Sequence, residues 1–262
     1  TADLLRIYGG DLTGSAFNAG DGSDITINAT KVHLETSDGR WLNDQSYSGI
    51  QAGVHNRGGL SEGRAGDVTI TATELDITNR GIISARTDGL GQGGNITLNL
   101  DRLNISEKGR IVASSRGPAD GGTVVVNAQD ILIEVSENNG PEEKFYSNGG
   151  IEVTTSGSGA GGDALVNADT LTIKSTHGFR PAGIIAQTTT GGGAAGSLYI
   201  DVGELVLLGD AQIQASTIGA GRAGDITVKA NTILLDAEQS ASEFSKGIVA
   251  ETSNRDMGSG AG

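Results

Sequence analysis

Residues 63–87 read GRAGDVTITATELDITNRGIISART, and this stretch contains one complete structural repeat. After Gly66, apolar residues alternate with Thr over residues 68–72, as expected of a half-buried strand. Two further apolar pairs follow, Leu75/Ile77 and Ile83/Ala85, each with the same period of two. The stretch therefore predicts three short strands separated by polar or Gly-rich turns.

The same arrangement recurs along the chain, each time after a glycine that precedes a short Ile/Val/Leu run. These anchor glycines are Gly22, Gly66, Gly94, Gly122, Gly162, Gly196 and Gly224. Their spacings are 44, 28, 28, 40, 34 and 28 residues, so the minimal repeat is 28 residues.

Three short strands in every repeat predict an all-β fold, a single-stranded right-handed parallel β-helix (β-solenoid) of about seven or eight coils. Stacking is required by the energy balance of one coil. Seven inward apolar side chains contribute on the order of 10 kcal/mol. Ordering the backbone of one repeat costs about 1–2 kcal/mol per residue. Each coil therefore depends on its neighbours for hydrogen bonds and for cover of its core.

The longer repeats carry extra residues at one corner, between the second and third predicted strands. These inserts are residues 35–48, 134–148, 174–181 and 236–246. We expect residues 1–262 to form one β-helix domain. The chain stops at Gly258–Gly262, which resembles the next anchor turn, so we expect it to be a piece of a longer repeat protein.

Composition narrows the functional classes. The formal charge is −14, which argues against nucleic acid and anionic membranes as partners, since both require basic patches. No window approaches the 18 continuous apolar residues of a membrane span, and no signal-peptide pattern opens the chain. The chain contains no Cys, which excludes disulfides and thiolate metal sites.

Several motifs have a structural explanation as well as a chemical one. Three G-x-G-x-x-G matches, at Gly89–Gly94, Gly157–Gly162 and Gly219–Gly224, each open a strand rather than a helix, so we interpret them as turns and expect no cofactor. Asp24 and Asp67 should be stacked neighbours. They suit either Ca²⁺ binding or acceptance of backbone N–H groups at a turn, and turn chemistry is the favoured interpretation.

Two predicted files of polar residues stack at other positions of the coil, one mostly of Asn and one of Thr and Ser. The members of the first are Asn28, Thr71, Asn99, Asn127, Asn167, Asp201 and Lys229, and those of the second are Thr87, Ser115, Thr155, Thr188, Thr217 and Thr252. We expect the amides to satisfy turn backbone groups. The three histidines, His33, His55 and His177, have no partner at a metal-ligand spacing, and we expect no metal site.

Aromatic residues give the best indication of a contact surface. Six of the nine lie in the corner inserts: Trp41, Tyr47, Phe145, Tyr146, Phe179 and Phe244. They either fold back over outward apolar residues of neighbouring strands or line a strip that binds a glycan or protein. Val125, Leu165 and Tyr199, outward on three successive coils, are a second candidate contact patch.

The phrase G-x-A-G-D-I-T-V/I-x-A, followed by L-x-I and G-x-I-x-A-x-T, recurs at residues 63–87 and in part at 221–230. It resembles the repeat region of filamentous-haemagglutinin-like exoproteins of two-partner secretion systems, over nearly the whole chain. The resemblance implies a parallel β-helical shaft, export through an outer-membrane transporter, and a place on the surface of a Gram-negative bacterium. The N-terminal secretion domain of that family is absent from these residues.

The sequence therefore predicts a non-catalytic structural or adhesive segment of a secreted surface protein. Two alternatives remain. In the first alternative, the rod is a subunit of a filament that self-assembles end to end, since both ends expose strand edges. Otherwise it is a polysaccharide-acting enzyme on the same architecture, although no acidic cluster is confined to two or three coils.

Overall fold

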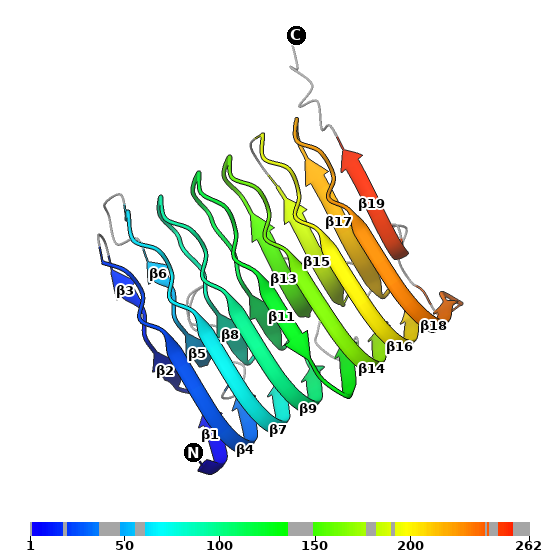
Figure 1. Cartoon of the computed structure of the whole chain (residues 1–262), viewed down its shortest axis with the longest axis horizontal. Coiled ribbons are helices and arrows are strands. Elements are labelled where there is room, and N and C mark those ends of the chain that lie inside the picture. Colours follow the sequence, from blue (N-terminus) through cyan, green and yellow to red (C-terminus); the bar gives the residue numbers. More distant parts are fainter. Residues whose placement is uncertain are drawn as a thin grey trace.

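The computed structural model describes residues 2–17, 20–36, 48–55, 61–135, 149–176, 182–189, 192–238, 240 and 246–253. Within these ranges every regular element is a β-strand, and all neighbouring strands pair in parallel. The strands form two main layers, and the chain advances by one strand in each layer per coil (Figure 1). The predicted parallel β-helix is confirmed.

The first layer, here called sheet A, contains the longer strands. Their order across the sheet follows the order of the sequence, so each coil lies beside the next one in the chain. The members are β1 (Ala2–Tyr8), β4 (Ile25–Glu35), β7 (Val68–Thr78), β9 (Ile96–Ser106), β11 (Val124–Asn127) with β12 (Asp130–Val135), β14 (Ala164–Ser175), β16 (Leu198–Gly209) and β18 (Ile226–Asp236).

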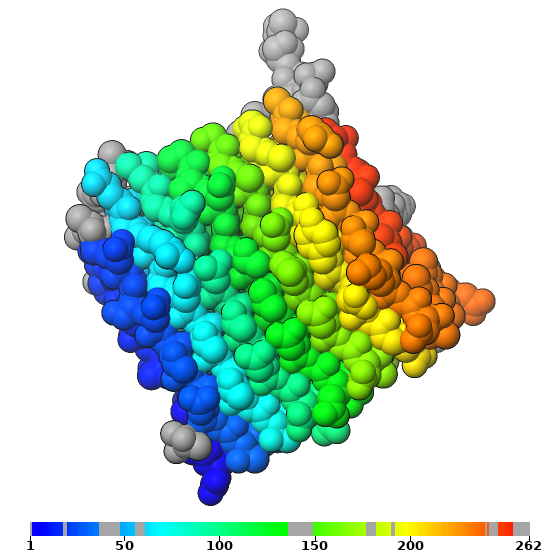
Figure 2. Space-filling model, viewed as in Figure 1, coloured from blue at the N-terminus to red at the C-terminus, as the bar shows by residue number. Residues whose placement is uncertain are grey.

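The second layer, here called sheet B, contains eight shorter strands in the same sequential order. They are β2 (Asp11–Thr13), β5 (Gly49–Gln51), β8 (Ile82–Ser84), β10 (Arg110–Val112), β13 (Gly150–Thr155), β15 (Gly183–Thr188), β17 (Gln212–Ile218) and β19 (Gly247–Ser253). A further pair, β3 (Ala16–Phe17) and β6 (Val54–His55), extends the first two coils. In a space-filling view the coils appear as successive bands of colour (Figure 2).

Two of the predicted short strands are merged into one in each of β4, β7, β9, β14, β16 and β18. Backbone pairing keeps one register from Ile25 to Glu35 along the neighbouring strand, and Thr30, at the position where a turn was expected, is the one residue that it skips. The alternation of inward and outward side chains is nevertheless interrupted there. Ile27 and Val32 are both buried, although residues five positions apart on a regular strand would face opposite sides. The strand therefore bends at one unpaired residue and resumes the same register, and only β11 and β12 remain separate strands.

The register also corrects one anchor. Ile25 pairs with Val68, an offset of 43 residues rather than the 44 expected from Gly22 and Gly66. A Cβ on Gly66 would meet the carbonyl oxygen of Ser23 at 2.4 Å, so Ser23 occupies the anchor position of that coil. Sequence reasoning preferred the glycine because every other repeat has one there.

One continuous apolar core lies between the two sheets. Sheet A contributes inward residues such as Leu75 and Ile77, and sheet B contributes residues such as Ile83, all fully buried. The same positions are filled in each interior coil, so every coil covers the core of the one before it. This matches the expectation that a single coil cannot be stable alone.

The third side of the coil is Gly-rich, extended, and only sparsely strand-like. Its backbones are hydrogen-bonded from coil to coil, for example Gly93 N–H to the carbonyl of Asp120 (3.1 Å) and Gly121 N–H to that of Ala160 (3.0 Å). The anchor glycines lie so close that a Cβ on Gly94, Gly122 or Gly162 would meet the carbonyl oxygen of the preceding anchor at 2.0, 1.9 and 1.9 Å, respectively. The three G-x-G-x-x-G motifs end on this side, directly before a sheet A strand.

The corner between sheets A and B accepts both tight turns and long insertions. In two of the coils without an insert it is a two-residue turn, Asn79–Arg80 or Glu107–Lys108, with positive φ at both residues, and in the third the positive φ falls on Gly209. In the longer coils this corner carries the predicted inserts. Their flanking residues 35, 134–135, 174–175 and 236 extend the sheet A strands, and most of the rest lies outside the described residues.

The glycine contacts predict a large stability difference between two Gly→Ala substitutions. Gly122→Ala should destabilise the protein by about 1–3 kcal/mol, because the added methyl group cannot fit against the carbonyl of Gly94 without moving the backbone. Gly192→Ala is the matched control, since a Cβ there has nothing within 4 Å. Thermal unfolding followed by circular dichroism should show a lower midpoint for Gly122→Ala only. Equal midpoints for the two variants would contradict the contact.

Candidate binding groove

An open groove of about 710 Å³ crosses sheet A at the bend of its strands. It runs over five coils, from β1 through β4, β7 and β9 to the junction of β11 and β12, and each coil contributes two or three consecutive residues. The bend that creates it is the place where two predicted strands merge into one.

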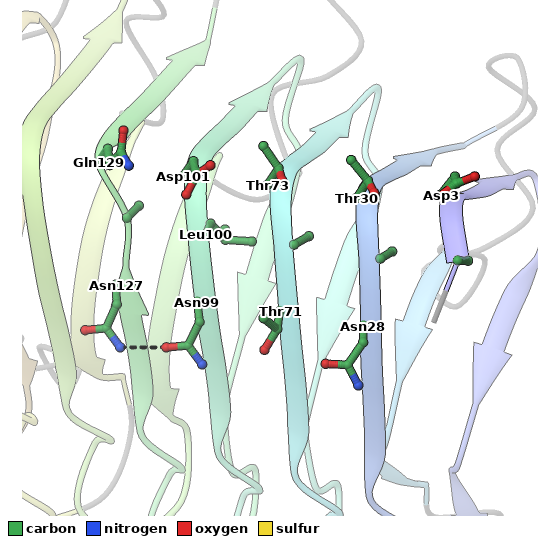
Figure 3. A pocket seen from close by; sticks show the side chains of 14 residues that line it. Asp3, Asn28, Thr30, Thr71, Thr73, Asn99, Leu100, Asp101, Asn127 and Gln129 are labelled. Carbon is green, nitrogen blue, oxygen red and sulfur yellow. Dashed lines mark hydrogen bonds between the residues drawn. The ribbon is translucent and has the colours of Figure 1, made fainter.

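Two polar rows and one small apolar row line the groove (Figure 3). The apolar row, Ala29, Ala72, Leu100 and Ala128, lies between the polar ones. The first polar row is Asn28, Thr71, Asn99 and Asn127, and the second is Asp3, Thr30, Thr73, Asp101 and Gln129. Backbone pairing puts the members of the first polar row on directly adjacent strands, and those of the second row are the residues that the pairing skips at the bend.

The first polar row is part of the predicted Asn file, and its stacking is confirmed. The Asn127 amide nitrogen donates to Asn99 Oδ1 at 3.0 Å, and that of Asn167 donates to Asn127 Oδ1 at 3.0 Å. The file continues to Asp201 and Lys229, whose charged groups are 3.5 Å apart. The expected bonds to turn backbone groups were wrong: these amides bond to one another along the outer face, in the middle of sheet A strands.

The groove lining contains two charged side chains, and both are negative. Asp3 and Asp101 are the charged side chains among its lining residues. Lys31 follows directly after the groove residue Thr30, but its Nζ lies 2.9 Å from Asp76 and 3.1 Å from Glu74. The hydrogen bonds to Asp76 and then Glu74 raise the pKa of Lys31 above its ordinary value. This ammonium group is therefore held by its own ion pairs.

The file that contains Asp24 and Asp67 has the predicted turn role. Asp24 Oδ1 accepts the N–H of Asp67 at 2.8 Å, and Asp67 Oδ1 accepts the N–H of Asn95 at 2.8 Å. The same bond joins Asn95 to Thr123 and Asp163 to Ser197. Each side chain thus satisfies a donor of the next coil. Among the described residues, no group of three or more His, Asp or Glu side chains is placed to hold a metal ion.

The Thr and Ser file is also confirmed as a stack, and all its members except Thr252, on the last strand, are buried. Thr87, Ser115, Thr155 and Thr188 are each at most 1% exposed. Three of their hydroxyl oxygens accept the N–H of the glycine two residues later, as Thr87 does from Gly89 at 3.2 Å. This file therefore fixes the turn into the Gly-rich side and offers nothing to a ligand.

The predicted aromatic strip cannot be placed on the fold. Its members Trp41, Tyr47, Phe145, Tyr146, Phe179 and Phe244 all lie outside the described residues. The second candidate patch is described: Val125, Leu165 and Tyr199 pair on β11, β14 and β16, and Tyr199 is 46% exposed. Each lies on the outer face two residues before a member of the Asn file. Their contact with a partner stays a prediction.

Sequence reasoning missed a polar cluster that joins three coils. Asp88 lies 3.3 Å from His55 Nδ1, 3.1 Å from Arg86 Nε and 3.6 Å from an Arg116 guanidinium nitrogen. Partial burial opposes ionisation of Asp88, but the hydrogen bond with His55 and the charges of Arg86 and Arg116 outweigh it. They lower the pKa of Asp88 below its ordinary value of 3.8.

Comparison of the chain with protein-family models, with curated proteins and with solved structures found no match. In the part of the chain that the structure describes, no helix has the length and apolar character needed to cross a bilayer. The groove and the patch therefore have to be interpreted from their own chemistry.

The Asp88 cluster predicts a specific acid sensitivity. Because its pKa is lowered on folding, Asp88 stabilises the protein above pH 3.8, and this contribution is lost as the pH falls through the lower folded value. Thermal midpoints measured from pH 6 to pH 2 should therefore converge between the wild type and Asp88→Asn at low pH. In a protein that also carries Arg116→Met, the substitution Asp88→Asn should change the thermal midpoint near pH 6 by less than it does in the wild type. Curves that stay parallel over the whole range would contradict the cluster's role.

Proposed function

We propose that this chain is a non-catalytic structural and adhesive segment of the shaft of a secreted bacterial surface protein. The observation that carries the proposal is the unbroken register of the coils, in which one core and two sheets continue through every layer. Such a stack holds outward side chains at fixed spacing along a rigid body. The resemblance of the repeat to filamentous-haemagglutinin-like exoproteins adds export by an outer-membrane transporter to the surface of a Gram-negative bacterium.

The outer face supports adhesion rather than a packing role alone. The groove presents exposed amides, hydroxyls and carboxylates from five successive coils, and Tyr199 adds an exposed aromatic ring nearby on the same sheet. Polar groups at regular spacing with an aromatic side chain suit a surface glycan or a protein loop. The unplaced aromatic inserts are a further proposed contact region.

Self-assembly into a filament is a second candidate, favoured by the outermost coils. In β18, Ile233, Leu234 and Leu235 are 50, 51 and 54% exposed, and Leu4 in β1 is 56% exposed. The outer edges of β1 and β18 have no neighbouring strand among the described residues. A second copy or further coils of the same chain would cover these edges equally well.

The shaft proposal predicts a monomeric rod that adheres to surfaces. Size-exclusion chromatography with light scattering should give one chain per particle at all concentrations, because the interior coils find all their pairing partners within the same chain. Beads coated with the protein should be retained on surfaces that carry glycans or extracellular proteins, whereas beads coated with albumin should not.

Concentration-dependent fibres in negative-stain images would favour the filament instead. Absence of retention on every surface, together with release of reducing ends from a polysaccharide, would favour the enzyme. Deleting residues 37–47 or 136–148 separates adhesion by the inserts from adhesion by the coils, since both segments lie at a corner that other coils close with a two-residue turn.

A further inference from the structure

We infer that the groove on sheet A binds a neutral, unbranched polysaccharide that lies across the strands, parallel to the axis of the coils. This inference rests on the proposed adhesive function and names the ligand class for it. The ligand's direction follows from the lining, because both polar rows run from strand to strand rather than along one strand (Figure 3).

The repeat of the groove matches a repeating ligand. Successive parallel strands are about 4.8 Å apart, so equivalent side chains recur at that interval over five coils. A polymer of identical units can place the same hydroxyl groups against the same side chains at each coil. A compact small molecule would contact only one or two coils and leave the rest of the rows unused.

The side chains suit hydroxyl groups in particular. An Asn amide has two donors and an acceptor oxygen with two lone pairs, and a Thr hydroxyl both donates and accepts. Asn127 uses one N–H and one lone pair of its amide on its neighbours in the file, which leaves its second N–H and second lone pair for a ligand. Sugar hydroxyls also donate and accept, so each ring can bond to both rows, while the row between them faces the core and is nearly closed to solvent, with Ala72 and Leu100 each only 8% exposed.

The negative charge of the groove lining favours a neutral polysaccharide over an acidic one. The lining carries Asp3 and Asp101, and the adjacent cation Lys31 is engaged by Asp76 and Glu74. The whole chain has a formal charge of −14. A polyuronate or sulfated glycan would meet like charges in the groove without a compensating basic side chain among the lining residues.

One end of the groove lies beside the patch of Val125, Leu165 and Tyr199. Asn127, a groove residue, is two residues from Val125 on β11, and the Asn file and the patch then run side by side across β14 and β16. A chain longer than the groove would therefore reach the exposed ring of Tyr199, and an aromatic ring packs well on the apolar face of a sugar. The patch extends the binding surface for long ligands.

The test is calorimetric titration of the intact chain with hexasaccharides. The probes are β-1,4-glucan, β-1,3-glucan, β-1,4-mannan and, as the acidic comparison, α-1,4-galacturonate. We expect at least one neutral hexasaccharide to bind and the galacturonate to bind at least tenfold more weakly. Asn99→Leu should weaken the neutral ligand about fivefold to tenfold through lost hydrogen bonds. Asn104→Leu is the matched control, because Asn104 is also outward on β9 but lies outside the groove.

Thr71→Val provides a second variant of nearly the same shape, in case Asn99→Leu perturbs the ladder, and it should also weaken binding severalfold. Tyr199→Ser should weaken a decasaccharide but not the hexasaccharide. No binding of any neutral probe, preferred binding of galacturonate, or equal loss in Asn99→Leu and Asn104→Leu would overturn the groove assignment. Bead adhesion that survives Asn99→Leu would overturn the groove assignment alone and leave the proposal of an adhesive shaft intact. Cleavage of a bound probe would instead overturn the non-catalytic function and leave the groove assignment intact.

Discussion

Close backbone contact on the Gly-rich side sets the geometry on which the other features depend. Where Gly94 and Gly122 stack, a Cβ would lie 2.0 and 1.9 Å from the carbonyl oxygen of the anchor below. No other residue type fits there without moving the main chain. The Gly-rich side has only a few strand residues to set the distance between its coils. The close glycine contacts allow its coils to stack at the same spacing as the strands of sheets A and B. The abundance of glycine is therefore a packing requirement, although a similar composition is typical of disordered chains.

Fixed spacing between coils converts repeated residues into continuous rows, and each row has a role set by its direction. Inward rows form the core. Hydroxyl and carboxylate rows near the turns, such as Thr87 and Asp67 with their successors, accept backbone N–H groups. The Asn99–Asn127 row points outward from a strand and bonds along itself, so it both stabilises the stack and faces solvent. Because the hydrogen bonds within this row already stabilise the stack, its outward groups can also bind a ligand without unfolding the coils.

Variation is confined to places where the scaffold tolerates it. The corner between sheets A and B is a two-residue turn in some coils and carries insertions in others, while the register of both sheets is unchanged. The outer face of sheet A varies from Thr97 to Val125, Leu165 and Tyr199 along one row. Insertions at one corner and substitutions on one face thus give particular coils their own surfaces while the stack remains continuous.

The sequence by itself determined the period, the inward residues and the vertical neighbours of most rows, because each coil contacts mainly the next and the anchor spacings of 28, 40 and 34 residues predict those contacts. It did not determine that two predicted strands merge into one bent strand, that Ser23 takes the anchor position of Gly22, or that His55 meets Asp88. Apolar periodicity records which side chains face inward but not how the backbone bends between them. The groove exists at that bend, and the Asp88 cluster joins residues 33 positions apart across coils of unequal length, so only the tertiary structure decided both.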